Sequence, residues 1–376
     1  MKKLIIAMMI IALVVVMAVS VSAAPAPATD FDYEVVGEAV TIKKYKGTTT
    51  EVEIPATIEG KPVTVIGEGA FNDIRTITKI VIPEGIVTIE KQAFYNCRGI
   101  TEIVVPNSVK TIGDEAFYNC RTLESFTLGS GVTSIGVKPI ESRALTTLKL
   151  TGGDNAYFKV ENGCLVDIAN KKLLVGAMQE TVIIPAGVEI IGEYALYGHG
   201  ATDTDGDGTS ETWVKHVVKT IVVADGVKVI EKGAFDATSV QVLVLPKSVT
   251  EIGNALAANT PLHKNKKFNL ELGNIYYEGT EEEYKAITKG GSNNAISGAN
   301  APIHYNSCIN NPNGWTHSEG ATCTYCNPPA GGQTPPAGGT TPNAPQTGST
   351  VTVLAVVAVV ALAATAVVIS KRRIED

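Results

Sequence analysis

The chain has 376 residues and a formal net charge of −7, from 31 basic and 38 acidic side chains. This acidic balance argues against a nucleic-acid partner, because binding to phosphates requires clustered Lys and Arg. Hydrophobic residues make up 44% of the chain and aromatic residues only 6%, so the apolar content consists mainly of Val, Ile, Ala and Leu. The length alone would allow several domains, but internal repeats make length a poor guide.

The N-terminus has the three parts of a secretory signal peptide. Lys2 and Lys3 give it a basic start, an apolar stretch runs from Leu4 to Val21, and small residues end it at Ala23. We therefore predict a signal peptide over residues 1–23 that is cleaved near Ala23. The alternative is an uncleaved membrane anchor, which the length of the apolar stretch leaves open.

An apolar pattern returns at a spacing of 22 or 23 residues in two parts of the chain, 77–150 and 218–245. Its first complete copy is Ile77-x-x-Ile80-x-Ile82, followed by Pro83. A second motif, Ile-Gly-x-x-Ala-Phe, keeps step with it and first appears from Ile66 to Phe71. The first pattern begins again at Ile100, Leu123, Leu145, Val218 and Val240. A fixed period of this length is the signature of a solenoid.

The two motifs predict the parts of one coil. Alternation of apolar and other residues has a period of two and is typical of a short strand with one buried face. Proline ends that strand because it has no N–H for the next ladder bond. The second motif returns the chain, with Ala and Phe inside the coil, and stacking of coils supplies the core. The sequence therefore predicts a β-rich leucine-rich repeat solenoid of parallel strands, with one short strand and a return segment in each coil.

The full repeat, I-x-x-I-x-I-P-x-x-V-x-x-I-G-x-x-A-F-x-x-C, resembles the BspA-type leucine-rich repeat family of bacterial surface proteins. Residues 31–71 are similar to its N-terminal coil, 155–163 to its hairpin insert and 276–306 to its closing module. The resemblance implies adhesion to host proteins or other cells, with ligands that vary between members. We assign the solenoid to 31–272, with inserts near 151–180 and 199–216, and the closing module to 273–306.

Within the closing module, Thr280 and Glu283 have the spacing of a capping box and predict the start of a short helix.

One residue in each predicted strand lies between the last two core positions and is expected to point out of the coil. Stacking would align these residues in one row, which we call the valine row. Polar residues flank it at positions such as Lys79, Glu102, Glu124, Lys219 and Gln241. An apolar row with a polar rim predicts a surface for an extracellular protein or glycan ligand, whereas strand propensity alone would also favour Val and Ile there. The valine row consists of Val81, Val104, Thr127, Lys149, Ile183, Val222 and Val244.

Two polar segments have candidate metal ligands. Asp203, Asp205, Asp207 and Glu211 resemble a calcium loop, although no Glu stands at the twelfth position, and a solvated acidic insertion is the alternative. The segment 307–326 contains a Cys-x-x-Cys with a nearby Cys and His, which suits a small zinc site, a disulfide or neither. Its candidate ligands are Cys308, His317, Cys323 and Cys326.

Cys97 and Cys120 occupy the same position in adjacent coils. Stacking places them within disulfide range, but buried free thiols that pack as small apolar groups are the other interpretation. Cys164 is expected in the core. No catalytic residues are predicted, because the remaining His residues have no Ser or Cys nucleophile context and the chain lacks a glycine-rich phosphate loop. We therefore expect a protein that is not an enzyme.

The C-terminal part has the order of a cell-wall anchor. A Pro- and Gly-rich spacer over 327–346 is followed by an apolar run over 351–369 and by basic residues, within a sorting region of 344–376. The run is long enough to cross a membrane, and the basic residues place the C-terminus in the cytoplasm. The motif that precedes the run is Pro345-Gln346-Thr347-Gly348.

This motif resembles an LPxTG-type sorting signal, with Ala344 at the usual position of Leu. The resemblance implies that the chain is a sortase substrate, cleaved after Thr347 and joined to the cell wall. The sequence thus predicts a binding and adhesion protein on the wall of a Gram-positive-type bacterium. The alternative is a single-pass membrane-anchored surface protein with a structural or enzyme-accessory role.

Overall fold

The computed structural model describes residues 24–197, 218–236, 238, 240–256, 273–291, 301 and 303–306. The chain divides into two compact units, Met1–Ile303 and His304–Asp376, and nearly all described residues belong to the first. The predicted signal peptide, calcium loop, Cys/His segment, spacer and sorting signal lie outside the described residues. In the described part of the chain, no helix is long and apolar enough to cross a membrane.

The solenoid begins with an antiparallel pair of strands that leads into the first coil. Strand β1 pairs antiparallel with β2, and β2 pairs parallel with β5, which in turn pairs antiparallel with the short β4. This segment consists of the 3-10 helix η1 (Ala28–Asp30) and strands β1 (Phe31–Val36), β2 (Ala39–Tyr45), β3 (Glu51–Glu53), β4 (Thr57–Ile58) and β5 (Lys61–Ile66).

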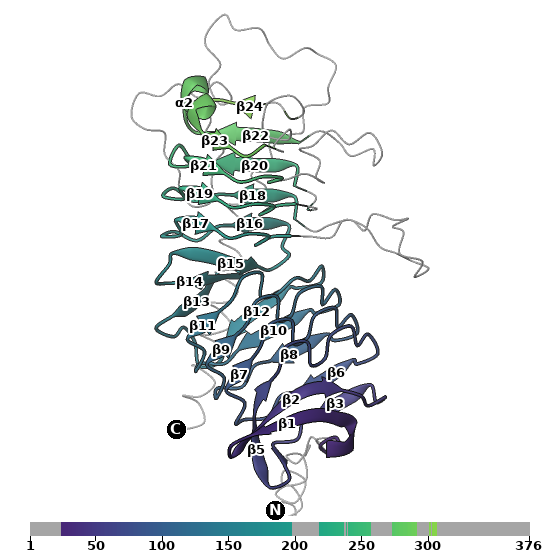
Figure 1. The fold of residues 1–376 in the computed structure, drawn as a ribbon. Helices are drawn as coiled ribbons and strands as arrows, with labels where there is room; N and C mark the ends of the chain where they lie inside the picture. The colour runs from purple at the N-terminus through teal and green to yellow at the C-terminus, as the bar shows by residue number, and fades with distance from the viewer. Residues whose placement is uncertain are drawn as a thin grey trace, which may run out of the picture. The chain divides into compact units, whose positions relative to one another are not determined.

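The next coils each contribute to two sides of the solenoid (Figure 1). Among the predicted strands, β8 pairs in parallel with β10 and β10 with β12, whereas β6 pairs in parallel with β3 in a separate two-stranded sheet. The Ile-Gly motif forms a second strand of only two residues, which pairs in its own parallel sheet. The first set is β6 (Lys79–Val81), β8 (Glu102–Val104), β10 (Ser125–Leu128) and β12 (Thr147–Leu150), and the second is β7 (Thr88–Ile89), β9 (Thr111–Ile112) and β11 (Ser134–Ile135).

An antiparallel meander interrupts the array after β12. Strands β13 (Phe158–Glu161), β14 (Cys164–Asp167) and β15 (Lys172–Gly176) pair in sequence order. The last of them pairs in parallel with β17, so the insert joins the sheet of two-residue strands that follows.

The array then resumes with the same two sets of strands. Strands β16, β18, β20 and β22 pair in parallel, and so do β17, β19, β21 and β23. Their bounds are β16 (Thr181–Ile183), β17 (Ile190–Ile191), β18 (Thr220–Val222), β19 (Val229–Ile230), β20 (Val242–Leu245), β21 (Glu251–Ile252), β22 (Asn274–Tyr277), helix α2 (Glu281–Ala286), β23 (Thr288–Lys289) and β24 (Ile303–His304). The predicted leucine-rich repeat solenoid is therefore confirmed.

The core consists of apolar ladders that run from coil to coil. The rings of Phe71 and Phe94 stack with centroids 4.9 Å apart, and those of Phe94 and Phe117 with centroids 5.2 Å apart. These rings and the Ala before each of them are buried, which confirms that the Ala-Phe pair fills the coil. Burying a Phe side chain contributes about 1.5–3 kcal/mol, so the ladder is a main source of stability.

Helix α2 begins with the predicted capping box. The backbone N–H of Glu283 donates to Oγ1 of Thr280 at 3.2 Å, and the backbone N–H of Thr280 donates to Oε2 of Glu283 at 2.7 Å. The ring of Tyr284 packs edge-on against Tyr277 of β22 at 5.1 Å, so the helix is fixed to the last strand of its sheet.

Candidate binding surfaces

The strand register aligns the members of the valine row within each sheet. Val104, Thr127 and Lys149 are register partners along β8, β10 and β12, and Val81 is paired with Glu53 of β3. In the later coils, Ile183, Val222, Val244 and Tyr276 are aligned in the same way. The alignment follows from the parallel pairing of residues at equivalent positions of the repeat.

Exposure differs along the valine row, and two of its members were predicted wrongly. Val104 is 49% exposed, while Val222 and Val244 are only 4% and 3% exposed. Register places Val244 beside the bulky Tyr276, which is itself 8% exposed. The alternation of strand residues correctly predicts that these residues align in a row. It does not predict whether other parts of the chain cover that row. The exposed part of the row is therefore centred on Val104, with Val81, Thr127 and Ile183 half-buried and Lys149 exposed.

The cysteines of adjacent coils are free thiols rather than a disulfide. Sγ of Cys97 donates to the carbonyl oxygen of Phe71 at 3.1 Å, and Sγ of Cys120 donates to that of Phe94 at 3.2 Å. Burial raises the pKa of Cys97 to about 12, so it stays protonated and unreactive. The interpretation as buried thiols is confirmed, and Cys164 is buried as expected.

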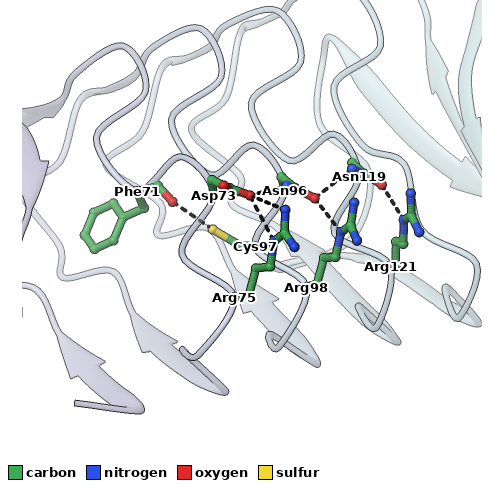
Figure 2. Close-up of polar contacts among 8 residues, drawn as sticks. All are labelled: Phe71, Asp73, Arg75, Asn96, Cys97, Arg98, Asn119 and Arg121. Atoms are coloured by element: carbon green, nitrogen blue, oxygen red, sulfur yellow. Dashed lines mark hydrogen bonds and ion pairs between the residues drawn. The ribbon is translucent and has the colours of Figure 1, made fainter. Parts of the chain in front are cut away.

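A polar ladder, which the sequence analysis did not predict, runs beside these thiols. Asp73, Asn96 and Asn119 occupy one position of successive coils and have φ values of 61°, 60° and 60°. Asp and Asn tolerate this left-handed conformation better than other non-glycine residues. Nδ2 of Asn119 donates to Oδ1 of Asn96 at 2.7 Å, and Nδ2 of Asn96 donates in turn to Oδ1 of Asp73 (Figure 2).

Each rung of the polar ladder also holds an arginine two residues later. The Nε–H groups of Arg75, Arg98 and Arg121 donate to Asp73, Asn96 and Asn119 at 3.0, 2.5 and 2.6 Å. Figure 2 shows these three side chains side by side and projecting in the same direction. We call Arg75, Arg98 and Arg121 the arginine row. Arg143 lies near its far end, where the charge of Arg121 acts on it. The sequence Asn-Cys-Arg recurs at 96–98 and 119–121 and could have indicated this row of arginines. Only its cysteines were used to predict structure.

A buried carboxyl group lies at the far end of the arginine row. Glu141 is 3% exposed. Burial raises its pKa to about 7, against the opposing effect of the guanidinium groups of Arg121 and Arg143. Burial and the neighbouring charge of Arg121 together lower the pKa of Arg143 to about 10. Like charges are thus held close together in this part of the solenoid.

The near end of the arginine row borders an open surface depression of about 610 Å³. Lys43 and Lys44 of β2 border the depression together with Arg75 and Tyr95, and Asp73 is the one carboxylate among its lining residues. In the described ranges, no group of three or more His, Cys, Asp or Glu side chains has the arrangement of a metal site.

Comparison with known protein families identifies the repeat. The model of the "BspA type Leucine rich repeat region" matches residues 44–160 and 210–278, in six copies. These two stretches are similar to BspA-type leucine-rich repeats. The polar ladder and the arginine row both lie within the first of these two BspA-type stretches.

Solved structures show more distant likenesses. A leucine-rich repeat protein from Bacteroides ovatus is 16% identical, with 71% of this chain and 76% of that chain covered and a TM-score of 0.43. A leucine-rich cell surface protein from Faecalibacterium prausnitzii is 16% identical, with coverages of 72% and 98% and a TM-score of 0.26. The pneumococcal vaccine antigen PcpA is 15% identical, with coverages of 75% and 98% and a TM-score of 0.33. No curated protein matches the chain.

Proposed function

We propose that this chain is a cell-surface binding and adhesion protein whose exposed valine row, centred on Val104, contacts an extracellular protein or glycan. The observation that carries the proposal is the 49% exposure of Val104 within an aligned row of strand residues. Glu102 and Glu124 beside it are exposed, so the apolar centre has a polar rim. Interfaces commonly combine a desolvated centre with such a rim. The BspA-type repeats support a role in binding rather than in catalysis.

The proposal is tested by comparing two single substitutions. The full-length protein in mild detergent is passed over immobilised host matrix proteins and over bacterial cell-wall glycan, and a retained ligand is identified by mass spectrometry. Val104→Asp places a charge at the centre of the row and is expected to weaken that binding about tenfold or more, which corresponds to about 1.4 kcal/mol. Val87→Asp is the matched control, because Val87 is 41% exposed and lies just before β7, outside the row.

The two variants should have the same unfolding midpoint as the unsubstituted protein. Equal binding by Val104→Asp and by the unsubstituted protein would place the ligand elsewhere and contradict the proposal.

We further propose that the protein is displayed on the cell wall through Pro345-Gln346-Thr347-Gly348. Support comes from the order of spacer, motif, apolar run and basic residues in the sequence. Protein released from the wall by a muramidase is expected to end at Thr347 joined to wall material, as read by mass spectrometry. Recovery of peptides through Asp376 from most of the protein would instead support a single-pass membrane protein with a structural or enzyme-accessory role.

A further inference from the structure

The two-residue strands of the solenoid are joined by a repeating backbone hydrogen bond that is interrupted at β11. In coil after coil, the carbonyl oxygen at one strand position accepts from a backbone N–H of the next coil, as that of Ile112 does from Gly136 at 2.8 Å. Carbonyl oxygens accept in the same way at Ile42, Ile66, Ile89, Leu173, Ile191, Ile230 and Ile252. Ile135 of β11 has the equivalent position, but within the described ranges no N–H of a later coil donates to its carbonyl.

Three backbone groups of the chain face this open edge of β11. The N–H groups of Ser134 and Gly136 donate back to Lys110 and Ile112 of the previous coil, at 3.1 and 2.8 Å. Alternate residues of a strand direct their hydrogen-bonding groups to opposite sides. The N–H and carbonyl of Ile135 and the carbonyl of the preceding residue, Thr133, therefore point away from that coil. An edge of this kind is a template for one more strand.

The edge is open because the meander takes the place of the next coil. Lys172 and Leu173 of β15 pair in parallel with β17, as a coil strand would. The other side of β15 is paired with β14, so β15 has no edge left for β11. A groove of about 350 Å³ remains between β11 and these strands. Lys138 and Glu193 link the two walls of the groove at 3.3 Å, so it is formed before any ligand binds.

Apolar side chains line the groove on both sides. Val137, two residues beyond Ile135, is 51% exposed. Ile135, Leu174 and Ile190 are half-buried along the same groove. An occupant with apolar side chains would remove this surface from water, which favours binding.

The charged groups of the groove already have partners within the protein. Lys138 is held in the ion pair described above, and Nζ of Lys172 donates to Oε1 of Glu231 at 2.8 Å. Asp167 accepts from the backbone N–H and the side-chain amide of Asn170 at 2.9 and 2.8 Å. A charged ligand would have to compete with these partners, whereas an uncharged ligand would leave them in place.

We propose that the open edge of β11 binds an extended, uncharged apolar peptide segment of a partner protein, which pairs with β11 as an added strand. The carbonyl oxygens of Thr133 and Ile135 accept from N–H groups of this segment, and the N–H of Ile135 donates to one of its carbonyl oxygens. A polypeptide fits this edge better than a glycan does, because it repeats N–H and C=O groups at the spacing of a strand. The site is independent of the ligand proposed for the valine row.

The probe is a labelled, end-blocked peptide with the sequence of residues 62–67, Pro-Val-Thr-Val-Ile-Gly. In β5 this sequence ends in the bond that β11 lacks, since the N–H of Gly67 donates to the carbonyl of Ile42 at 2.8 Å. Binding to the full-length protein in mild detergent is measured by fluorescence polarisation. N-methylation of the peptide's Gly removes that donor and is expected to weaken binding about tenfold or more. N-methylation of its Ile is the matched control, because this N–H faces away from β11 and its loss should change binding much less.

A substitution in the groove gives the second comparison. Val137→Asp places a charge against the bound strand and is expected to weaken binding of the unmethylated peptide about tenfold or more. Val87→Asp is the matched control, because Val87 is 41% exposed and lies outside the groove. Val104→Asp should also bind the peptide normally, since β8 belongs to the other sheet. All three variants should keep the unfolding midpoint of the unsubstituted protein.

Four results would overturn the proposal. They are no binding of the unmethylated peptide, equal binding of the two methylated peptides, equal loss in Val137→Asp and Val87→Asp, and a dimer of the unsubstituted protein that Val137→Asp converts to a monomer. The last result, read by sedimentation, would assign the groove to a second copy of this chain. The comparison of methylated peptides requires no change in the protein, so it decides even if Val137→Asp lowers the unfolding midpoint.

Discussion

Glu141 is the residue through which the stability of this solenoid is expected to depend most strongly on pH. Burial raises its pKa from 4.5 to about 7, although Arg121, Arg143 and Arg98 oppose this effect, and Tyr118 and Tyr197 are also nearby. Below about pH 4.5 the group is protonated in both the folded and the unfolded chain. Above about pH 7 it is ionised in both, and the folded state carries the cost of a buried charge.

We therefore predict that Glu141→Gln stabilises the protein at pH 8 and has little effect near pH 4. The raised pKa corresponds to a loss of about 3 kcal/mol in the free energy of unfolding of the unsubstituted protein between about pH 4.5 and pH 7. Glu141→Gln avoids this loss. Urea denaturation at the two pH values measures the difference. Glu102→Gln, at an exposed position of β8, should show no such gain. An equal effect at both pH values would contradict the prediction.

Asn96 combines a hydrogen-bonding role with an unusual backbone conformation. It accepts from Arg98 and Asn119, donates to Asp73 and has a φ of 60°. Asn96→Ala is expected to reduce the free energy of unfolding by about 2–4 kcal/mol, from unmatched polar groups and from the left-handed backbone. Asn72→Ala, at an exposed neighbouring position, serves as the control in the same denaturation experiment. A loss no larger than that of the control would show that the ladder adds no stability.

At the scale of the element, helix α2 depends on its cap because it has only six residues. An isolated helix of this length is unstable in water. Thr280→Ala is expected to lower the free energy of unfolding by about 1 kcal/mol, and hydrogen exchange in residues 281–286 should become faster. Glu282→Ala removes an exposed side chain from the same first turn and should have a smaller effect. Unchanged exchange in Thr280→Ala would mean that packing alone holds the helix.

Individual elements also show why sequence predicted some features and missed others. The long period of the repeat identified the coils, and the spacing of Thr280 and Glu283 identified the cap. Two-residue strands such as Thr88–Ile89 are too short to show a periodic pattern, so the second sheet was not predicted. The ladder of Asp73, Asn96 and Asn119 depends on left-handed turns that no hydrophobic pattern reveals. The burial of Val222 was not predicted, because the alternation of residues in a strand does not indicate what covers the sheet.

At the scale of the whole molecule, the meander of β13–β15 separates two stacks of coils. In the part of the chain that the structure describes, neither β11 nor β12 pairs with a strand of the later coils. Contacts between the stacks include the ion pair of Lys138 with Glu193 at 3.3 Å and the backbone bond from Met178 to Leu145 at 2.6 Å. In repeat proteins each coil is stabilised mainly by its neighbours, so the two stacks should unfold as separate units.

Substitution of one core ring in each stack tests this independence. Phe117→Ala is expected to lower the midpoint of one calorimetric transition, and Phe235→Ala that of another, because each loses about 3–5 kcal/mol in its own stack. Both rings are fully buried, so the pair is matched in environment. A single transition that both substitutions lower equally would show that the solenoid unfolds as one cooperative unit.

The polar ladder has a consequence for how such a protein changes in evolution. Each Asn of the ladder donates to the rung before it and accepts from its own arginine. The coil 86–108, which contains Asn96, therefore offers a donor to the coil before it and an acceptor to the coil after it. Duplication of that segment in the gene would insert a coil whose hydrogen bonds, phenylalanine stack and thiol all find partners. The inserted coil would also add one guanidinium group to the row. The array would then lengthen coil by coil, without any new residue having to arise by point mutation.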